Sequence, residues 1–176
     1  MNPLKDKRGL TEAEAIERYR QKNYPKPALT ADIAVFAKGE TGCKRLLIRR
    51  GGHPFLGQWA LPGGCADMGE TIEQTAAREL AEETYMEGLP LTLVNVYSAP
   101  GRDPRGWTVS VAYAVCVEQG LQTAIAGDDA AETGWFDVVK NEAGVACVEL
   151  PEGEKLAFDH VQIIADAARA LNLTMK

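Results

Sequence analysis

Short apolar runs, separated by glycine and proline, predict the strands of this 176-residue chain. These runs are rich in β-branched and apolar residues, a composition typical of strands. They cover residues 28–37, 45–50, 58–61, 91–99, 107–118 and 134–138. Polar and apolar positions alternate poorly within residues 107–118, so we expect both faces of that strand to be covered.

Helical periodicity is found near both ends of the chain. Thr11 and Glu14 form a capping box, which predicts a short helix over residues 11–22. Near the C-terminus, Asp159 is a candidate N-cap. The apolar face of the helix after it is expected to consist of Val161, Ile164, Ala168 and Leu171. Strands interleaved with two or three helices indicate a layered α/β domain.

The most informative pattern is a third helix, within Gly64–Met86, that is crowded with glutamates. At about 100° per residue, one side of this helix carries an apolar stripe. The stripe consists of Ile72, Ala76, Leu80 and Thr84. Glu79 and Glu83 fall beside Ile72 on the same wheel, and Glu82 lies further round. Carboxylates therefore flank the face that should pack against protein.

Carboxylates in such a position need a neutralising partner, because like charges and burial both destabilise them. Oxygen-rich clusters suit hard cations such as magnesium. The alternative is a solvated acidic face on which Arg78 pairs with Glu82. The wheel position, together with the glycine turn at Pro62-Gly63-Gly64, favours the cation site.

Composition describes an ordinary globular chain, with 45% apolar and 25% charged residues. We expect residues 1–27 to form a capped helix and an extended entry segment, and residues 28–176 to form one domain. The net charge of −6 argues against a nucleic-acid partner. Binding of anionic phosphates would require a metal or local arginines.

Cysteine usage and the N-terminus indicate a cytoplasmic protein. The four cysteines are widely spaced, so we expect reduced, mostly buried thiols rather than disulfides or a zinc site. Residues 1–10 contain no apolar core of a signal peptide, and no apolar run reaches membrane-spanning length. We therefore expect no membrane partner.

Arginines flank the glutamate segment at two places. Arg49 and Arg50 end a predicted strand, where alternation should direct only one of them inward to bind phosphate. Arg102, Asp103 and Arg105 lie in the loop Pro100-Gly-Arg-Asp-Pro-Arg-Gly106 between two strands. Arginine suits bidentate contact with phosphate, which makes the four arginines candidate substrate ligands, and Asp103 is a further candidate in the same loop. Surface turns and ion pairs explain both stretches equally well.

The glutamate segment resembles the signature box of the Nudix hydrolases. The matching residues are Gly64, Glu70, Arg78, Glu79, Leu80, Glu82 and Glu83. Tyr85 departs from the pattern, because the family usually has glycine there to end the helix in a left-handed conformation. We expect Gly88 to end the helix about one turn later.

The resemblance implies an α/β/α sandwich with a mixed sheet, and a catalytic magnesium that manganese could replace. In such proteins the metal ligands would be Glu79, Glu82 and Glu83, with the Gly64 carbonyl and Glu70. Arg78 would orient the glutamates. A further acid before the last strand would act as base or ligand. Candidates for it are Glu132, Asp129 and Asp128, in that order.

The loop at residues 100–106 is similar to that of ADP-ribose pyrophosphatases within the family. This likeness implies a small-molecule nucleotide substrate, with ADP-ribose cleaved to AMP and ribose 5-phosphate, and a homodimer. One alternative is hydrolysis of oxidised nucleoside triphosphates by the same box. Another is a non-catalytic sensor of ADP-ribose, because Nudix-derived regulators share the loop motif.

Overall fold

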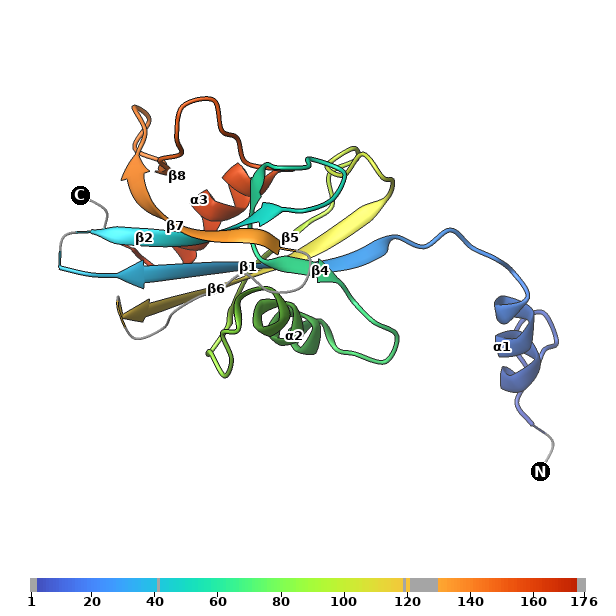
Figure 1. Ribbon diagram of the computed structural model, residues 1–176. Coiled ribbons are helices and arrows are strands. Elements are labelled where there is room, and N and C mark those ends of the chain that lie inside the picture. Colours follow the sequence, from blue (N-terminus) through green and yellow to red (C-terminus); the bar gives the residue numbers. More distant parts are fainter. Residues whose placement is uncertain (1–2, 41, 119, 121–129, 174–176) are drawn as a thin grey trace.

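The computed structural model describes residues 3–40, 42–118, 120 and 130–173 (Figure 1). Its helices are α1 (Glu12–Arg20), α2 (Ile72–Thr84) and α3 (His160–Ala170). Its strands are β1 (Ala28–Lys38), β2 (Cys43–Arg50), β3 (Trp59–Ala60), β4 (Gly63–Cys65), β5 (Thr92–Tyr97), β6 (Thr108–Glu118), β7 (Ala130–Lys140) and β8 (Ala146–Val148). Within the described part of the chain, no helix has the length and apolarity that a membrane span requires.

The strands form a mixed sheet in the order β5-β6-β1-β2-β7-β8, with β3 added to β2 and β4 added to β1. Strands β1 and β6 run parallel, and the other pairs are antiparallel. Helix α2 covers one face and α3 covers the other (Figure 1). The expected α/β sandwich with a mixed sheet is therefore confirmed.

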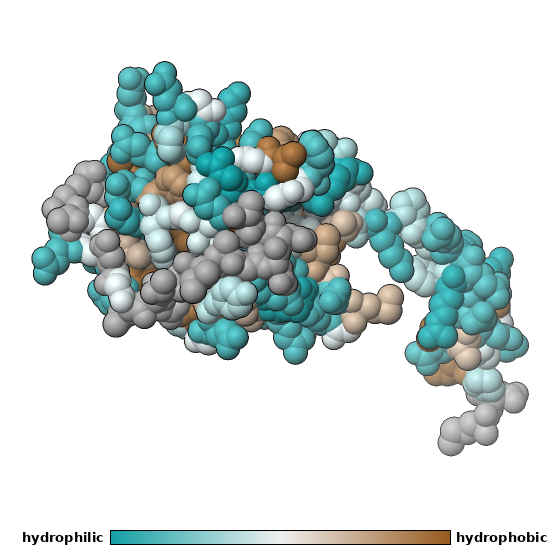
Figure 2. Space-filling model, in the orientation of Figure 1, coloured by the Kyte–Doolittle hydropathy of each residue, from teal (hydrophilic) through white to brown (hydrophobic). Residues whose placement is uncertain are grey.

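The two faces of β1 lead to two cores, because successive side chains of a strand point to opposite faces. Ile33 and Val35 pack with Leu80 of α2 in one core. Ala34 and Phe36 pack toward α3 in the other. The central part of β1 is thus buried on both sides. The surface of the molecule, by contrast, is mostly hydrophilic on the face shown in Figure 2.

Helix α1 lies apart from the domain, at the end of an extended segment (Figure 1). Thr11 and Glu14 form the expected capping box, and none of the residues of α1 is buried. In the described chain, α1 therefore lies outside the two cores.

Four details differ from the sequence expectations. Strands β4 and β8 were not predicted. Helix α2 ends at Thr84, with Tyr85 itself left-handed at φ 57°, rather than near Gly88. On α3, Val161 is exposed and Ile163 is buried in its place. Two of the four free thiols, Cys65 and Cys116, are exposed rather than buried.

Candidate active site

Strand β4 places the glutamate helix against the sheet. Gly63 pairs with Asp32, and Gly64 pairs with Ala31. A side chain at Gly63 would overlap the Ala31 carbonyl, and its φ of 150° also requires glycine. A side chain at Gly64 would overlap the Glu79 carboxylate. The two glycines therefore allow α2 and its carboxylates to approach the backbone closely.

Arg78 contacts three glutamates, one in the loop before α2 and two on the helix itself. Its guanidinium donates to Glu70 at 2.7 Å, to Glu79 at 2.7 Å and to Glu82 at 3.0 Å. It also donates to the carbonyl of Cys65 at 3.0 Å. The Arg78 contacts hold the pKa of Glu70 down, to about 2. Arg78 thus fixes the orientation of these carboxylates.

Glu79 and Glu83 line a cavity of about 560 Å³ together with Arg50 and Arg105. Burial, with repulsion from Glu79 adding to it, raises the pKa of Glu83 to about 8. The Glu83 carboxylate accepts one hydrogen bond, from the Gly63 amide at 2.8 Å. Burial also raises the pKa of Glu79. Two carboxylates whose charged forms are disfavoured thus face one space.

The donor set of this cavity fits a hard divalent cation. Carboxylate oxygens are the ligands such ions prefer, and a cation would offset the repulsion that raises both pKa values. In the structure, no group of three acidic, histidine or cysteine side chains among the described residues forms a complete metal site. Arg78 donates hydrogen bonds to oxygens of Glu79 and Glu82. Because Arg78 contacts one oxygen of each, the second oxygen of Glu79 and of Glu82 stays available to a cation while the contact with Arg78 is kept.

Arg50 supplies the positive charge of the cavity. Its guanidinium donates to the Pro54 carbonyl at 2.8 Å and lies 5.0 Å from the centre of the Phe158 ring. Among the ion pairs of the described residues, none includes Arg50, whereas Arg105 pairs with Asp103 at 2.7 Å. Arg50 is thus the cation most available to an anionic ligand.

Arg102, which was expected to bind phosphate, does not line the cavity of Glu79 and Glu83, and its guanidinium is already paired. Its side chain is 5% exposed and makes a bidentate pair with Asp159 at 2.6 and 2.8 Å. Asp159 precedes α3 but forms no capping hydrogen bond, because its carboxylate is engaged by Arg102. The Arg102–Asp159 pair thus fastens the 100–106 loop to the start of α3.

Arg49 and Glu132 are also not brought to the cavity. Arg49 donates to Glu132 at 3.0 Å and to Glu154 at 2.7 Å, and its guanidinium stacks on Trp59. Neither Arg49 nor Glu132 lines the space that Glu79 and Glu83 share. The other candidate acids, Asp128 and Asp129, lie outside the described residues.

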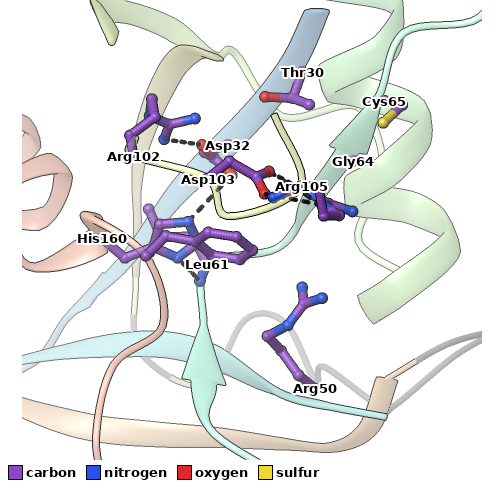
Figure 3. Close-up of a pocket in the computed structure, with 12 residues that line it drawn as sticks. Thr30, Asp32, Arg50, Leu61, Gly64, Cys65, Arg102, Asp103, Arg105 and His160 are labelled. Carbon is purple, nitrogen blue, oxygen red and sulfur yellow. Dashed lines mark hydrogen bonds and ion pairs between the residues drawn. The ribbon is translucent and has the colours of Figure 1, made fainter. Parts of the chain in front are cut away.

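A second, smaller cavity was not predicted. It has a volume of about 90 Å³ and is lined by residues that include Asp32, Asp103 and His160 (Figure 3). The Leu61 amide donates to His160 Nδ1 at 2.9 Å, and burial lowers the pKa of His160, so its imidazole is neutral. The one sequence feature that could have indicated this cavity was Asp32, an acidic residue inside an apolar strand.

A NUDIX domain model matches residues 26–151, most of the chain and the whole of the glutamate box. The chain belongs to the Nudix family. This Nudix protein is 40% identical to the ADP-ribose pyrophosphatase of Methanocaldococcus jannaschii, over 89% of its own length and 81% of the relative. It is 31% identical to the ADPR responsive transcriptional repressor NtrR of Acinetobacter baylyi, over 92% of its own length and 61% of the relative.

Solved structures agree with the Nudix assignment. One is the NUDIX domain of Shewanella oneidensis NrtR complexed with ADP ribose, which superimposes with a TM-score of 0.76 at 34% identity. The match covers 92% of this Nudix protein and 99% of that chain. A MutT/nudix family protein from Enterococcus faecalis gives a TM-score of 0.81 at 33% identity, covering 94% and 71%. The predicted family and fold are confirmed.

Proposed function

We propose that this Nudix protein hydrolyses ADP-ribose to AMP and ribose 5-phosphate with the help of magnesium. The observation that carries the proposal is the shared cavity in which Glu79 and Glu83 face Arg50. An anionic diphosphate needs both the arginine and a cation there, because the carboxylates alone would repel it. The similarity to an ADP-ribose pyrophosphatase over 89% of the chain supports this choice of substrate.

Each residue of the box has a proposed role. Glu79 and Glu83 would hold the cation, with Glu82, Glu70 and the Gly64 carbonyl as further ligands. When bound, the cation would offset diphosphate charge and lower the pKa of the attacking water. Arg50 would bind the diphosphate, with Arg105 beside it. Arg78 would position the glutamates as it does in the structure.

The proton of the attacking water would pass to a glutamate of the box, because Glu132 is engaged by Arg49. Water would attack one phosphorus of the diphosphate, and the bond from that phosphorus to the bridging oxygen would break. Each product would keep one phosphate, as AMP and ribose 5-phosphate.

A non-catalytic sensor is the second candidate, and the likeness to the repressor NtrR is the observation that favours it. Catalysis is preferred because all the box glutamates are retained and the Arg78 contacts orient them. We further propose that the protein is cytoplasmic and homodimeric, and that manganese can replace magnesium.

The substrate assignment is tested by comparing kcat/KM for ADP-ribose and 8-oxo-dGTP, each with magnesium. We expect ADP-ribose to be the better substrate and its products to be AMP and ribose 5-phosphate. A triphosphate preferred over ADP-ribose would overturn the assignment. Tight binding of ADP-ribose without turnover would identify a sensor instead.

A further inference from the structure

The smaller cavity opens from the same space as the glutamate cavity, because Arg50, Gly64 and Arg105 line both. Its walls come from three separate parts of the fold. Thr30 and Asp32 extend from β1, Asp103 comes from the 100–106 loop, and His160 begins α3 (Figure 3). A group attached to a diphosphate in the larger cavity could therefore enter the smaller one.

The cations around the smaller cavity are already neutralised. Arg102 pairs with Asp159 and lies 3.6 Å from Asp32, and Arg105 pairs with Asp103. A phosphate placed here would meet the carboxylates of Asp32 and Asp103 with no available countercharge beyond Arg50. Because repulsion inside a buried site is costly, this cavity is unsuited to a further phosphate.

Asp32 offers hydrogen-bond acceptors instead. Its residue is 8% exposed, and its carboxylate accepts a hydrogen bond from the Ser110 hydroxyl. The nearest nitrogen of His160 is 3.5 Å away, beyond a normal hydrogen bond. A carboxylate has about four acceptor positions, so Asp32 retains capacity for ligand hydroxyls. The Thr30 hydroxyl lies on the same wall (Figure 3).

The size of the cavity excludes a large aromatic group. A volume of about 90 Å³ corresponds to roughly three water molecules at liquid density. Such a space admits part of a compact, hydroxyl-bearing ring and leaves a purine base outside. Acceptor-rich walls and small volume thus indicate the same class of ligand.

We infer that the smaller cavity binds the sugar that the diphosphate links to the nucleotide, and that Asp32 is the specificity-determining residue that accepts its hydroxyl hydrogens. The inference rests on the proposed function and deepens it, since it explains selection of a sugar-linked diphosphate over a triphosphate. With a triphosphate, the third phosphate would have to lie against Asp32 or remain outside the cavity.

Calorimetric binding of ADP-ribose and of ADP tests this inference, because ADP lacks the second sugar. Calcium, another hard divalent cation, replaces magnesium, because the diphosphate needs a cation beside the glutamates, and chromatography checks that the ADP-ribose stays intact. We expect Asp32→Asn to weaken ADP-ribose binding about tenfold, because a charged acceptor is replaced by a neutral amide that keeps only one acceptor oxygen, and to leave ADP binding unchanged or improved. Asp137→Asn, the same change on the exposed part of β7, should alter neither.

Thr30→Val provides a second test that removes no charge. It should weaken ADP-ribose binding by a few-fold and spare ADP. Equal losses for both ligands, or no loss in either variant, would overturn the sugar site. If the wild-type chain binds ADP-ribose through Asp32 but fails to hydrolyse it with magnesium, the proposed catalysis fails and the sugar site stands.

Discussion

Glu83 combines burial, a neighbouring carboxylate and a single hydrogen bond from the Gly63 amide. Burial disfavours the charged form of a carboxyl group, and Glu79 adds repulsion. Perturbed acids of this kind, gathered in a cavity, are typical of functional sites. The arrangement is costly without a cation, which is the physical reason to assign one here.

The pKa of Glu83 predicts how the stability of the metal-free protein depends on pH. Its folded pKa of about 8 lies above the ordinary value of a glutamate side chain, so the folded state holds the proton more tightly. The contribution of Glu83 to the free energy of unfolding should therefore be fully present below that ordinary value and be lost as pH rises toward about 8. Urea unfolding in EDTA at several pH values measures this.

The matched variant for the pH test is Glu83→Gln, which cannot ionise. Its free energy of unfolding should fall less over the same pH range than that of the wild type. Identical slopes in the two proteins would contradict the raised pKa. Magnesium should flatten the wild-type slope, because metal binding favours the ionised carboxylate.

The positions of single side chains were predictable where they depend on local spacing. The wheel placed Glu79 and Glu83 beside the apolar stripe, and the structure turns both toward one cavity. Pairing across long sequence separations was not predictable: Arg102 meets Asp159, 57 residues later. For the same reason, the contact of Arg49 with Glu132, 83 residues apart, was not predicted.

Helix α2 ends at a non-glycine residue in the left-handed conformation. Tyr85 adopts φ 57°, and its amide donates to the Ala81 carbonyl, as a glycine at a helix C-terminus commonly would. The Tyr85 residue is 64% exposed, so its ring contributes little burial. The tertiary fold thus imposes on tyrosine the conformation that the sequence led us to expect at Gly88.

Replacement of Tyr85 with glycine should stabilise the protein by about 1 kcal/mol, because it removes the left-handed strain of a residue with a Cβ. Urea denaturation gives the change in the free energy of unfolding. Tyr85→Ala is the control, since it removes the ring but keeps the strain, and should bring no such gain. Equal effects of the two substitutions would show that the ring, not the backbone, matters.

Strands with a continuous apolar run were predicted best. The apolar run that became β1 has eight consecutive buried residues, a strong signal in sequence. Strands β4 and β8 have three residues each and exist because longer neighbours offer them a pairing edge. No local sequence pattern predicts such strands.

At the level of the complete chain, α1 contributes no buried residue to the core. No residue of α1 is buried, and β1 begins the domain at Ala28. We propose residues 28–176 as the catalytic domain. Removal of residues 1–25 should change the melting temperature by less than about 2 °C, as expected when no buried area is lost. A larger drop would show that the segment packs on the domain or on a second copy.

We propose that the carboxylates of the shared cavity make the protein a magnesium-dependent hydrolase. This proposal is tested by measuring kcat for ADP-ribose at saturating magnesium in Glu83→Gln and in Glu87→Gln, a change in an exposed glutamate just beyond α2. We predict a loss of at least about 100-fold for the first, since even residues that only support metal ligands cost 10–100-fold, and none for the second. Turnover near that of the wild type in Glu83→Gln would contradict the account.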